Sequence, residues 1–167
     1  MLKIGLLSDT HNYLDPQIFD YFADRDEIWH VGDFGSIEVS EKLSQFKKLR
    51  AVYGNIDGQY IRQLHPRTQK FKVEGIEVWM NHKGGYPGRY NKRFDQTLSR
   101  FPPQLYISGH SHILKIVRDK KLNNMLVVNP GAAGRYGIHQ VRTIIRFELN
   151  KGKIQNMDVI ELGTRGS

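Results

Sequence analysis

Ser108-Gly109-His110-Ser111-His112 follows the short apolar run Leu105-Tyr106-Ile107, and this junction decides the interpretation of the sequence. In a strand, alternate residues face the same side, so two histidines one residue apart at a strand end point into one space. Histidine is the commonest metal-ligating side chain, through a neutral ring nitrogen. A His-x-His pair alone is also compatible with a polar loop, so the rest of the chain has to decide between the two interpretations.

Four other predicted strands also end in residues that bind metals. These ends are Ser8-Asp9-Thr10-His11, Gly32-Asp33, Gly54-Asn55 and Asn81-His82. Open α/β sheets bind ligands beyond the carboxyl ends of their strands. Each end alone is compatible with an ordinary turn, but five such ends, all at the same end of a strand, favour a shared metal site. The candidate metal ligands are Asp9, His11, Asp33, Asn55, His82, His110 and His112.

The apolar patterns predict a single α/β domain over residues 1–162. Strands over residues 3–8, 27–31 and 49–53 alternate with helical patterns, which is typical of a parallel sheet. A hairpin around Glu74-Gly75 follows, and apolar residues from Tyr86 to Phe101 have helical spacing. The later strands are expected to be mostly antiparallel. The predicted fold is therefore two packed mixed β-sheets flanked by helices, with a flexible tail over residues 163–167.

Composition limits the chemistry and the partners. The chain has 167 residues and no cysteine, so a bound metal must use nitrogen and oxygen ligands. No apolar run reaches the roughly 20 residues that span a bilayer, and the first residues lack a signal-peptide pattern. We therefore expect a cytoplasmic protein without membrane contact. The formal net charge of +8 favours anionic partners, either phosphate esters or nucleic acid. A homo-oligomer remains open.

Seven ligands are too many for one tetrahedral ion. They suit two ions about 3.5–4 Å apart that share a carboxylate, which is the arrangement used in phosphate chemistry. Mixed imidazole, carboxylate and amide ligation fits manganese, iron, zinc or nickel better than calcium. We expect two divalent transition-metal ions, with manganese first among them. The glycines before Asp33, Asn55 and His110 allow sharp turns and a close approach to the backbone.

The ordered motifs Asp9-x-His11, Gly32-Asp33, Gly54-Asn55, His82 and Gly109-His110-x-His112 resemble those of the calcineurin-like metallophosphoesterase superfamily. The resemblance is greatest to its small single-domain phosphodiesterases, and it implies a β-sandwich flanked by helices. It implies that one metal is held by Asp9, His11 and His112. It implies that the other is held by Asn55, His82 and His110, and that Asp33 bridges both.

The same resemblance implies the reaction. A metal-bridging hydroxide attacks the phosphorus of a phosphate diester, and Asn55 also touches the substrate phosphate. Asp33 and Asn55 are therefore the expected catalytic residues. Lys83, which stands where glycine is usual, and Arg135 are expected to stabilise charge on the phosphoryl oxygens.

One departure concerns the leaving group. Many members of the superfamily carry a histidine just after the asparagine, where it acts as a general acid, but here the residue is Ile56. The small phosphodiesterases also lack that histidine. The proton donor is thus unidentified, and good leaving groups are expected to react best.

The expected function is a two-metal phosphodiesterase that acts on a small-molecule or nucleotide diester. Three alternatives remain open at this stage. The retromer subunit of the superfamily is similar in fold and works as a scaffold, so one alternative is a non-catalytic interaction module. A nuclease is suggested only by the positive charge, and a phosphomonoesterase is made less attractive by Ile56. The basic, tyrosine-containing segment 83–93 either contacts a substrate or begins a helix.

Overall fold

The first of two sheets combines the amino-terminal strands with the last two strands of the chain. The computed structural model describes residues 1–167. The sheet has the order β10-β9-β1-β2-β3. Its strands are β1 (Leu2–Leu7), β2 (Glu27–His30), β3 (Lys48–Ala51), β9 (Val141–Asn150) and β10 (Lys153–Thr164). β1, β2 and β3 run parallel, whereas β9 pairs antiparallel with both β1 and β10.

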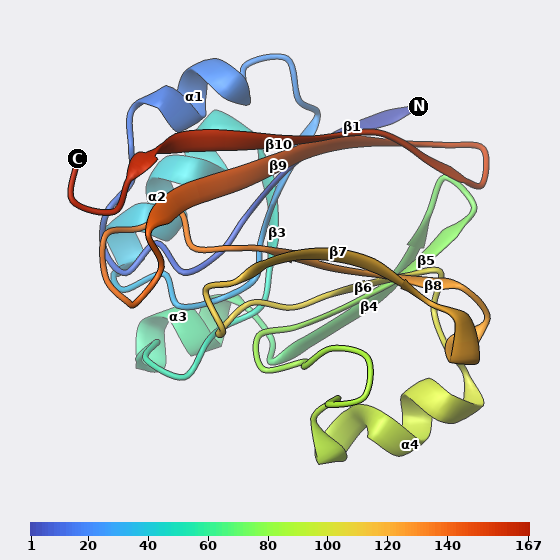
Figure 1. Cartoon of the computed structure of the whole chain (residues 1–167). Coiled ribbons are helices and arrows are strands. Elements are labelled where there is room, and N and C mark those ends of the chain that lie inside the picture. The colour runs from blue at the N-terminus through green and yellow to red at the C-terminus, as the bar shows by residue number, and fades with distance from the viewer.

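The second sheet is built from the middle of the chain and packs face to face on the first (Figure 1). It has the order β4-β5-β6-β8-β7. Its strands are β4 (Thr68–Val73), β5 (Ile76–Asn81), β6 (Leu105–Ile107), β7 (Leu114–Asp119) and β8 (Met125–Pro130). β5, β6 and β8 are parallel, and β4 and β7 are antiparallel edge strands. The prediction of two packed mixed sheets is confirmed.

Helices cover the outer faces of both sheets (Figure 1). They are α1 (Gln17–Tyr21), α2 (Ile37–Phe46), α3 (Gln59–Leu64) and α4 (Lys92–Arg100), with a short 3₁₀ helix over Lys120–Leu122. α1 and α2 lie over the first sheet, and α4 lies under the second. No helix in the chain has the length and apolar character that a membrane crossing needs.

Three apolar layers hold these parts together, because side chains alternate between the faces of each strand. The central layer lies between the sheets and contains Leu6, Trp29 and Met80 among its buried residues. A second layer joins the first sheet to its helices, and a third, around Trp79 and Leu98, joins the second sheet to α4. The two sheets are therefore held rigidly, which fixes the loops at their ends.

Two features differ from the sequence prediction. The helix expected from Tyr86 begins only at Lys92, because Gly85 and Gly88 adopt positive φ and Asn91 caps the helix by accepting from the amide of Arg93. The later strands pair mostly antiparallel, as expected: four of the six pairings made by β4 to β10 are antiparallel, and the two parallel ones join β5, β6 and β8.

The carboxyl-terminal boundary also differs from the prediction. β10 continues to Thr164, two residues beyond the predicted domain end at residue 162. The Ser167 hydroxyl then donates to the Thr164 carbonyl and accepts from Arg142, which is buried against Asp15. The segment 163–167 is thus tied to the first sheet by hydrogen bonds.

Gly5 of β1 is predicted to be essential for stability. A Cβ at this position would lie 2.6 Å from the Phe22 ring, which belongs to the apolar layer between the first sheet and its helices. Gly5→Ala is therefore expected to lower the free energy of unfolding by about 1–3 kcal/mol through overpacking. Denaturant unfolding measures this change. Gly166→Ala is the control, because a Cβ there meets no atom within 4 Å. Equal stability of the two variants would contradict the packing described here.

Candidate metal centre

Seven side chains from five loops meet where the two sheets end. Each loop follows the carboxyl end of a parallel strand, which is where open α/β sheets bind their ligands. Asp9 and His11 follow β1, Asp33 follows β2, and Asn55 follows β3. His82 follows β5, and His110 and His112 follow β6. The sequence prediction that these seven residues come together agrees with the structure.

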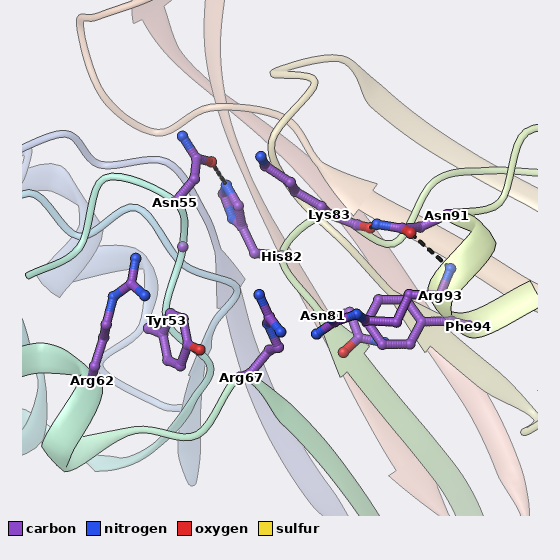
Figure 2. Close-up of a pocket in the computed structure, with 11 residues that line it drawn as sticks. Tyr53, Asn55, Arg62, Arg67, Asn81, His82, Lys83, Asn91, Arg93 and Phe94 are labelled. Atoms are coloured by element: carbon purple, nitrogen blue, oxygen red, sulfur yellow. Dashed lines mark hydrogen bonds between the residues drawn. The ribbon is translucent and has the colours of Figure 1, made fainter.

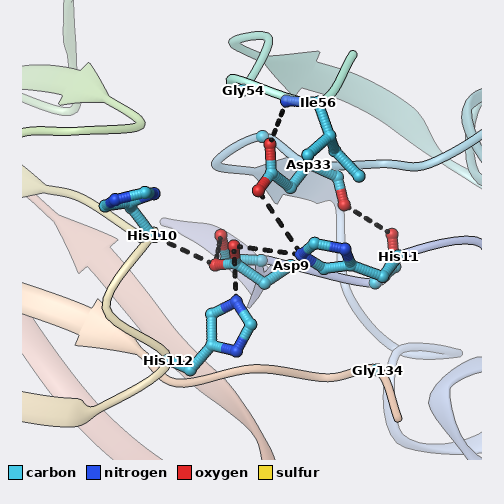
Figure 3. A network of polar contacts seen from close by, with 12 residues as sticks. Asp9, His11, Asp33, Gly54, Ile56, His110, His112 and Gly134 are labelled. Carbon is cyan, nitrogen blue, oxygen red and sulfur yellow. Dashed lines mark hydrogen bonds and ion pairs between the residues drawn. The ribbon is translucent and has the colours of Figure 1, made fainter. Parts of the chain in front are cut away.

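Six of the seven residues form two compact groups. In each group, one potential ligand atom per residue lies within 4.8 Å of the others. The first group is Asp9, His11 and His112, and the second is Asp33, His82 and His110. Figure 3 shows Asp9, Asp33 and their histidine partners converging on one space. The first group has the three members of one ion site that the sequence resemblance implies. The second has His82 and His110 of the other site together with Asp33, the expected bridging residue.

Asp33 joins the two groups. Its Oδ2 atom lies 3.4 Å from His11 Nε2 in the first group and 3.2 Å from His82 Nε2 in the second. Its other oxygen, Oδ1, accepts a hydrogen bond from the amide of Ile56 at 3.1 Å. Oδ2 is therefore the atom placed to be shared between two ions.

Asn55 belongs to the second group through its amide oxygen. Asn55 Oδ1 lies 3.0 Å from His82 Nε2 and 3.0 Å from His110 Nδ1 (Figure 2 shows the contact with His82). The amide nitrogen of Asn55 donates to no protein acceptor. The side chain thus presents its oxygen to the histidines and its N–H₂ group to the open side of the site.

The environment of His82 tests whether a cation fits the site. Its Nδ1 lies 2.7 Å from the Val31 carbonyl oxygen, an acceptor only, so Nδ1 carries the proton. Nε2 then faces Asp33 Oδ2, Asn55 Oδ1 and, at 3.8 Å, Asp9 Oδ1, which are also acceptors. Four acceptors without a donor between them require a shared cation, either an extra proton or a metal ion.

Two buried atoms of the first group have no hydrogen-bond partner in the structure. They are Asp9 Oδ1 and His11 Nε2. Leaving a buried polar atom unpaired costs about 1–3 kcal/mol. A metal ion held by nitrogen and oxygen ligands removes this cost, and mixed imidazole and carboxylate ligation suits first-row transition metals. The residues present therefore fit the pair of ions.

The pKa values of these groups show how strongly the site favours positive charge. Burial alone would raise the pKa of Asp9 and Asp33, yet the close approach of the facing histidine rings holds both pKa values well below the usual range. Burial alone would lower the pKa of His11, but Asp33 and Asp9 raise it to about 9. Asp33 raises the pKa of His82 in the same way, against the effect of burial.

The ligand loops have unusual backbone conformations. Five of the seven side chains stand on residues with positive φ, between 43° at His11 and 69° at His110. The set is Asp9, His11, Asp33, His110 and His112. Such residues are uncommon outside glycine, although Asp, Asn and His tolerate this region better than most. They cost of order 1–3 kcal/mol each and cluster at functional sites.

Gly54 and Gly109 allow the loops to approach each other. A Cβ on Gly54 would overlap the Oδ1 atom and the backbone nitrogen of Asp33. A Cβ on Gly109 would lie 2.9 Å from Asp9 Oδ2 and would also overlap Ser8 Oγ. The close approach that these glycines were expected to provide is thus seen at both positions.

Asp57 supports the ligand loops, although the sequence does not single it out. It is buried, and its carboxylate accepts hydrogen bonds from the backbone amides of Asp33, Gly35 and Gly54 at 2.8–3.1 Å. It therefore fastens the loop after β2 to the loop after β3. The available signal was an acidic residue three positions after Gly54, but nothing local distinguishes it from a turn residue.

His30 and Phe34 also contact and stabilise these loops. The His30 ring stacks on Phe34 with centroids 3.7 Å apart, contacts Thr10 Oγ1 and accepts from the amide of Gly32. Complete burial lowers the pKa of His30 to about 3, so this histidine is neutral. These contacts give His30 a structural role.

The two remaining site candidates, Lys83 and Arg135, lie at the rim, as does Ile56. Lys83, directly after His82, is exposed and lines the cavities on both sides of its loop. Arg135 lines a further cavity with His110 and His112, but its guanidinium stacks 3.8 Å above the Tyr13 ring and donates to the Ser167 carbonyl. The Ile56 side chain is 46% exposed beside Asp33 (Figure 3).

The chain was compared with known proteins. A profile of the calcineurin-like phosphoesterase superfamily domain matches residues 2–152. This chain belongs to that superfamily. A probable metallophosphoesterase of Methanothermobacter thermautotrophicus is 30% identical over 78% of this chain and 77% of its own length. A phosphodiesterase of Methanocaldococcus jannaschii is 24% identical over 81% of this chain and 86% of its own length.

Solved structures share the fold of this phosphoesterase domain. An archaeal phosphodiesterase superposes with a TM-score of 0.75 over 96% of this chain and 100% of that one, at 22% identity. Wild-type Vps29 of Entamoeba histolytica, solved in complex with zinc, superposes with a TM-score of 0.70 over 96% of this chain and 99% of that one, at 16% identity. At these identities the structures establish the common fold alone.

Replacing Asp57 is predicted to weaken the metal centre without touching a ligand. Asp57→Ala removes the acceptor of three buried amides and is expected to cost about 3 kcal/mol of folding free energy. It is also expected to weaken Mn²⁺ binding by about 10–100-fold, as loss of groups behind the ligands usually does. Thermal unfolding and Mn²⁺ titration measure the two effects.

Asp158→Ala is the matched control for this prediction, since Asp158 is exposed and its side chain makes no hydrogen bond. Wild-type Mn²⁺ affinity in the Asp57 variant would show that Asp57 does not position the ligand loops.

Proposed function

We propose that this phosphoesterase hydrolyses phosphate diesters with two divalent metal ions, manganese being the first candidate. The observation that carries the proposal is the Asp33 carboxylate, whose Oδ2 atom faces both histidine groups within 3.4 Å. When bound, two such ions lower the pKa of a shared water and offset charge on the phosphoryl oxygens. The relative named as a phosphodiesterase supports the choice of diesters.

Each residue of the proposed site has its own task. Asp9, His11 and His112 would hold one ion, and Asn55, His82 and His110 the other, with Asp33 shared. The free amide group of Asn55 is placed to donate a hydrogen bond to a phosphoryl oxygen. Lys83, exposed at the rim without a carboxylate partner, is placed to offset negative charge there. Arg135 can serve the substrate only after leaving its contact with Ser167.

The turnover experiment uses protein reconstituted with Mn²⁺ and bis(p-nitrophenyl) phosphate. Asp33→Asn keeps the shape of the side chain but removes the charge that two ions would share. Because even groups behind the ligands change activity by about 10–100-fold, this variant is expected to lose more than about 100-fold in kcat/KM. Asp158→Asn controls for the loss of one charge. Full activity of Asp33→Asn, with wild-type metal content, would refute the shared role.

A second prediction concerns the leaving group. Ile56 contributes only its backbone amide to the site, through Asp33, and its side chain has no proton to give. Rates are therefore expected to fall steeply as the pKa of the leaving alcohol rises, from p-nitrophenyl to alkyl diesters. Ile56→His, which supplies a proton donor, is expected to make this dependence shallower. A flat dependence in the unmodified protein would mean that another residue protonates the leaving group.

A non-catalytic scaffold is the second candidate, favoured by the likeness to Vps29. The zinc complex of Vps29 is a case of metal binding on this fold, and metal binding alone does not establish turnover. A measurement of turnover distinguishes the two candidate functions. Metal-loaded protein that cleaves no aryl phosphodiester would favour the scaffold, whereas turnover that depends on Asp33 would exclude it as the whole function.

A further inference from the structure

A basic cavity opens beside the metal centre (Figure 2). It has a volume of about 200 Å³ and is lined by eleven residues, none of them Asp or Glu. Asn55 and His82 form the wall that it shares with the second metal group. Four cationic side chains line it, namely Arg62, Arg67, Lys83 and Arg93. A ligand bound in the metal centre can therefore extend into this cavity.

These four cations have no anionic partner within the chain. The ion pairs of the protein involve other residues and lie elsewhere, for example Arg142 with Asp15 and Arg25 with Asp24. Arg67 makes no side-chain hydrogen bond, and Arg62 donates only to the Asp57 carbonyl oxygen. Like charges gathered without a counter-charge repel one another, so the cavity is suited to an anion from solution.

Contacts next to the metal centre fix the side chain of Arg62 and the backbone at Lys83 and Arg93. Arg62, on α3, has its guanidinium 4.5 Å above the Tyr53 ring, and its Nε donates to the Asp57 carbonyl at 2.7 Å. On the other side, Asn91 donates to the Lys83 carbonyl at 2.8 Å and accepts from the amide of Arg93 at 3.0 Å. Asn91 thus couples the loop after His82 to the start of α4.

The composition of the cavity favours phosphate over other anions. Three of the four cations are arginines, whose planar guanidinium groups match phosphate oxygens in pairs and stay charged at any physiological pH. The cations come from three segments of the chain: α3 and the turn after it, the loop after β5, and the start of α4. All three segments therefore face one cavity.

We propose that this cavity binds a second phosphate group of the substrate. The substrate is then a phosphodiester that carries a further phosphate close to the scissile one, as a phosphorylated nucleotide or the end of a nucleotide chain does. This inference rests on the proposed hydrolysis of diesters and names the substrate class for that site. It also assigns a binding role to part of the net charge of +8.

The test compares diesters that differ only by the second phosphate. Thymidine 5′-(p-nitrophenyl phosphate) with a free 3′-hydroxyl is set against the same compound with a 3′-phosphate, using Mn²⁺-loaded protein. We expect kcat/KM to be about tenfold or more higher for the compound with two phosphates, which corresponds to one charge-assisted contact. Arg67→Gln is expected to reduce this ratio towards one.

Arg100→Gln is the matched control, because Arg100 lies at the far end of α4, outside the cavity, and the substitution removes the same charge. The control should keep the ratio of the unmodified protein. A ratio near one in that protein, or the same fall in both variants, would overturn the inference while leaving the hydrolysis of diesters intact.

Binding to metal-free protein separates this inference from the proposed function. Calorimetry should show thymidine 3′,5′-bisphosphate binding about tenfold more tightly than thymidine 5′-monophosphate, and Arg67→Gln should remove the difference. Selective binding without any turnover would refute the proposed hydrolysis alone. Equal binding of both compounds, with no effect of Arg67→Gln, would refute the proposal that the cavity binds a second phosphate.

A third ligand, a single-stranded decathymidylate, identifies the source of the phosphate. Binding that depends on Arg67 and is tighter than that of the bisphosphate assigns the second phosphate to a nucleic-acid chain. Binding no tighter than that of the bisphosphate assigns it to a small nucleotide. Oligonucleotide binding that is insensitive to Arg67→Gln would place nucleic acid elsewhere on the protein and count against the cavity as its site.

Discussion

The structure depends on a cluster of oxygen and nitrogen atoms with free electron pairs, and no group of the chain neutralises the negative charge that they carry. Around His82 Nε2 stand two carboxylate oxygens and one amide oxygen, while its other ring nitrogen is already committed to the Val31 carbonyl. Such an arrangement is stable only when a cation lies between its members. The pKa of His11, raised to about 9, has the same origin, because the Asp33 and Asp9 carboxylates favour the protonated ring.

The fold supplies the rigidity that this concentration of charge needs. Parallel strands in both sheets deliver their carboxyl ends to one edge, and the apolar layer between the sheets fixes how far apart those ends lie. Behind the ligands, the Asp57 carboxylate and the neutral His30 ring hold the loops in left-handed backbone conformations. The strain in the loops is thus supported by packing and hydrogen bonds outside the ligand set.

The sequence predicts that these seven residues meet because each stands beside a predicted strand end. His-x-His after an apolar run, or Gly-Asp at a strand end, is ambiguous alone, but five such ends at the carboxyl edge of a sheet favour one shared site. Asp57 was missed because its three partners come from two different loops. The helix predicted from Tyr86 was placed too early, because helical spacing of aromatics outweighed Gly85 and Gly88. The basic cavity was not foreseen, since Arg62, Arg67 and Arg93 are brought together only by the tertiary fold.

Anomalous diffraction from crystals soaked in Mn²⁺ tests the central claim most directly. The account predicts two manganese peaks in each chain, one among Asp9, His11 and His112 and the other among Asp33, His82 and His110, with Asp33 between them. A single peak away from these residues, or no peak at all after soaking, would contradict it.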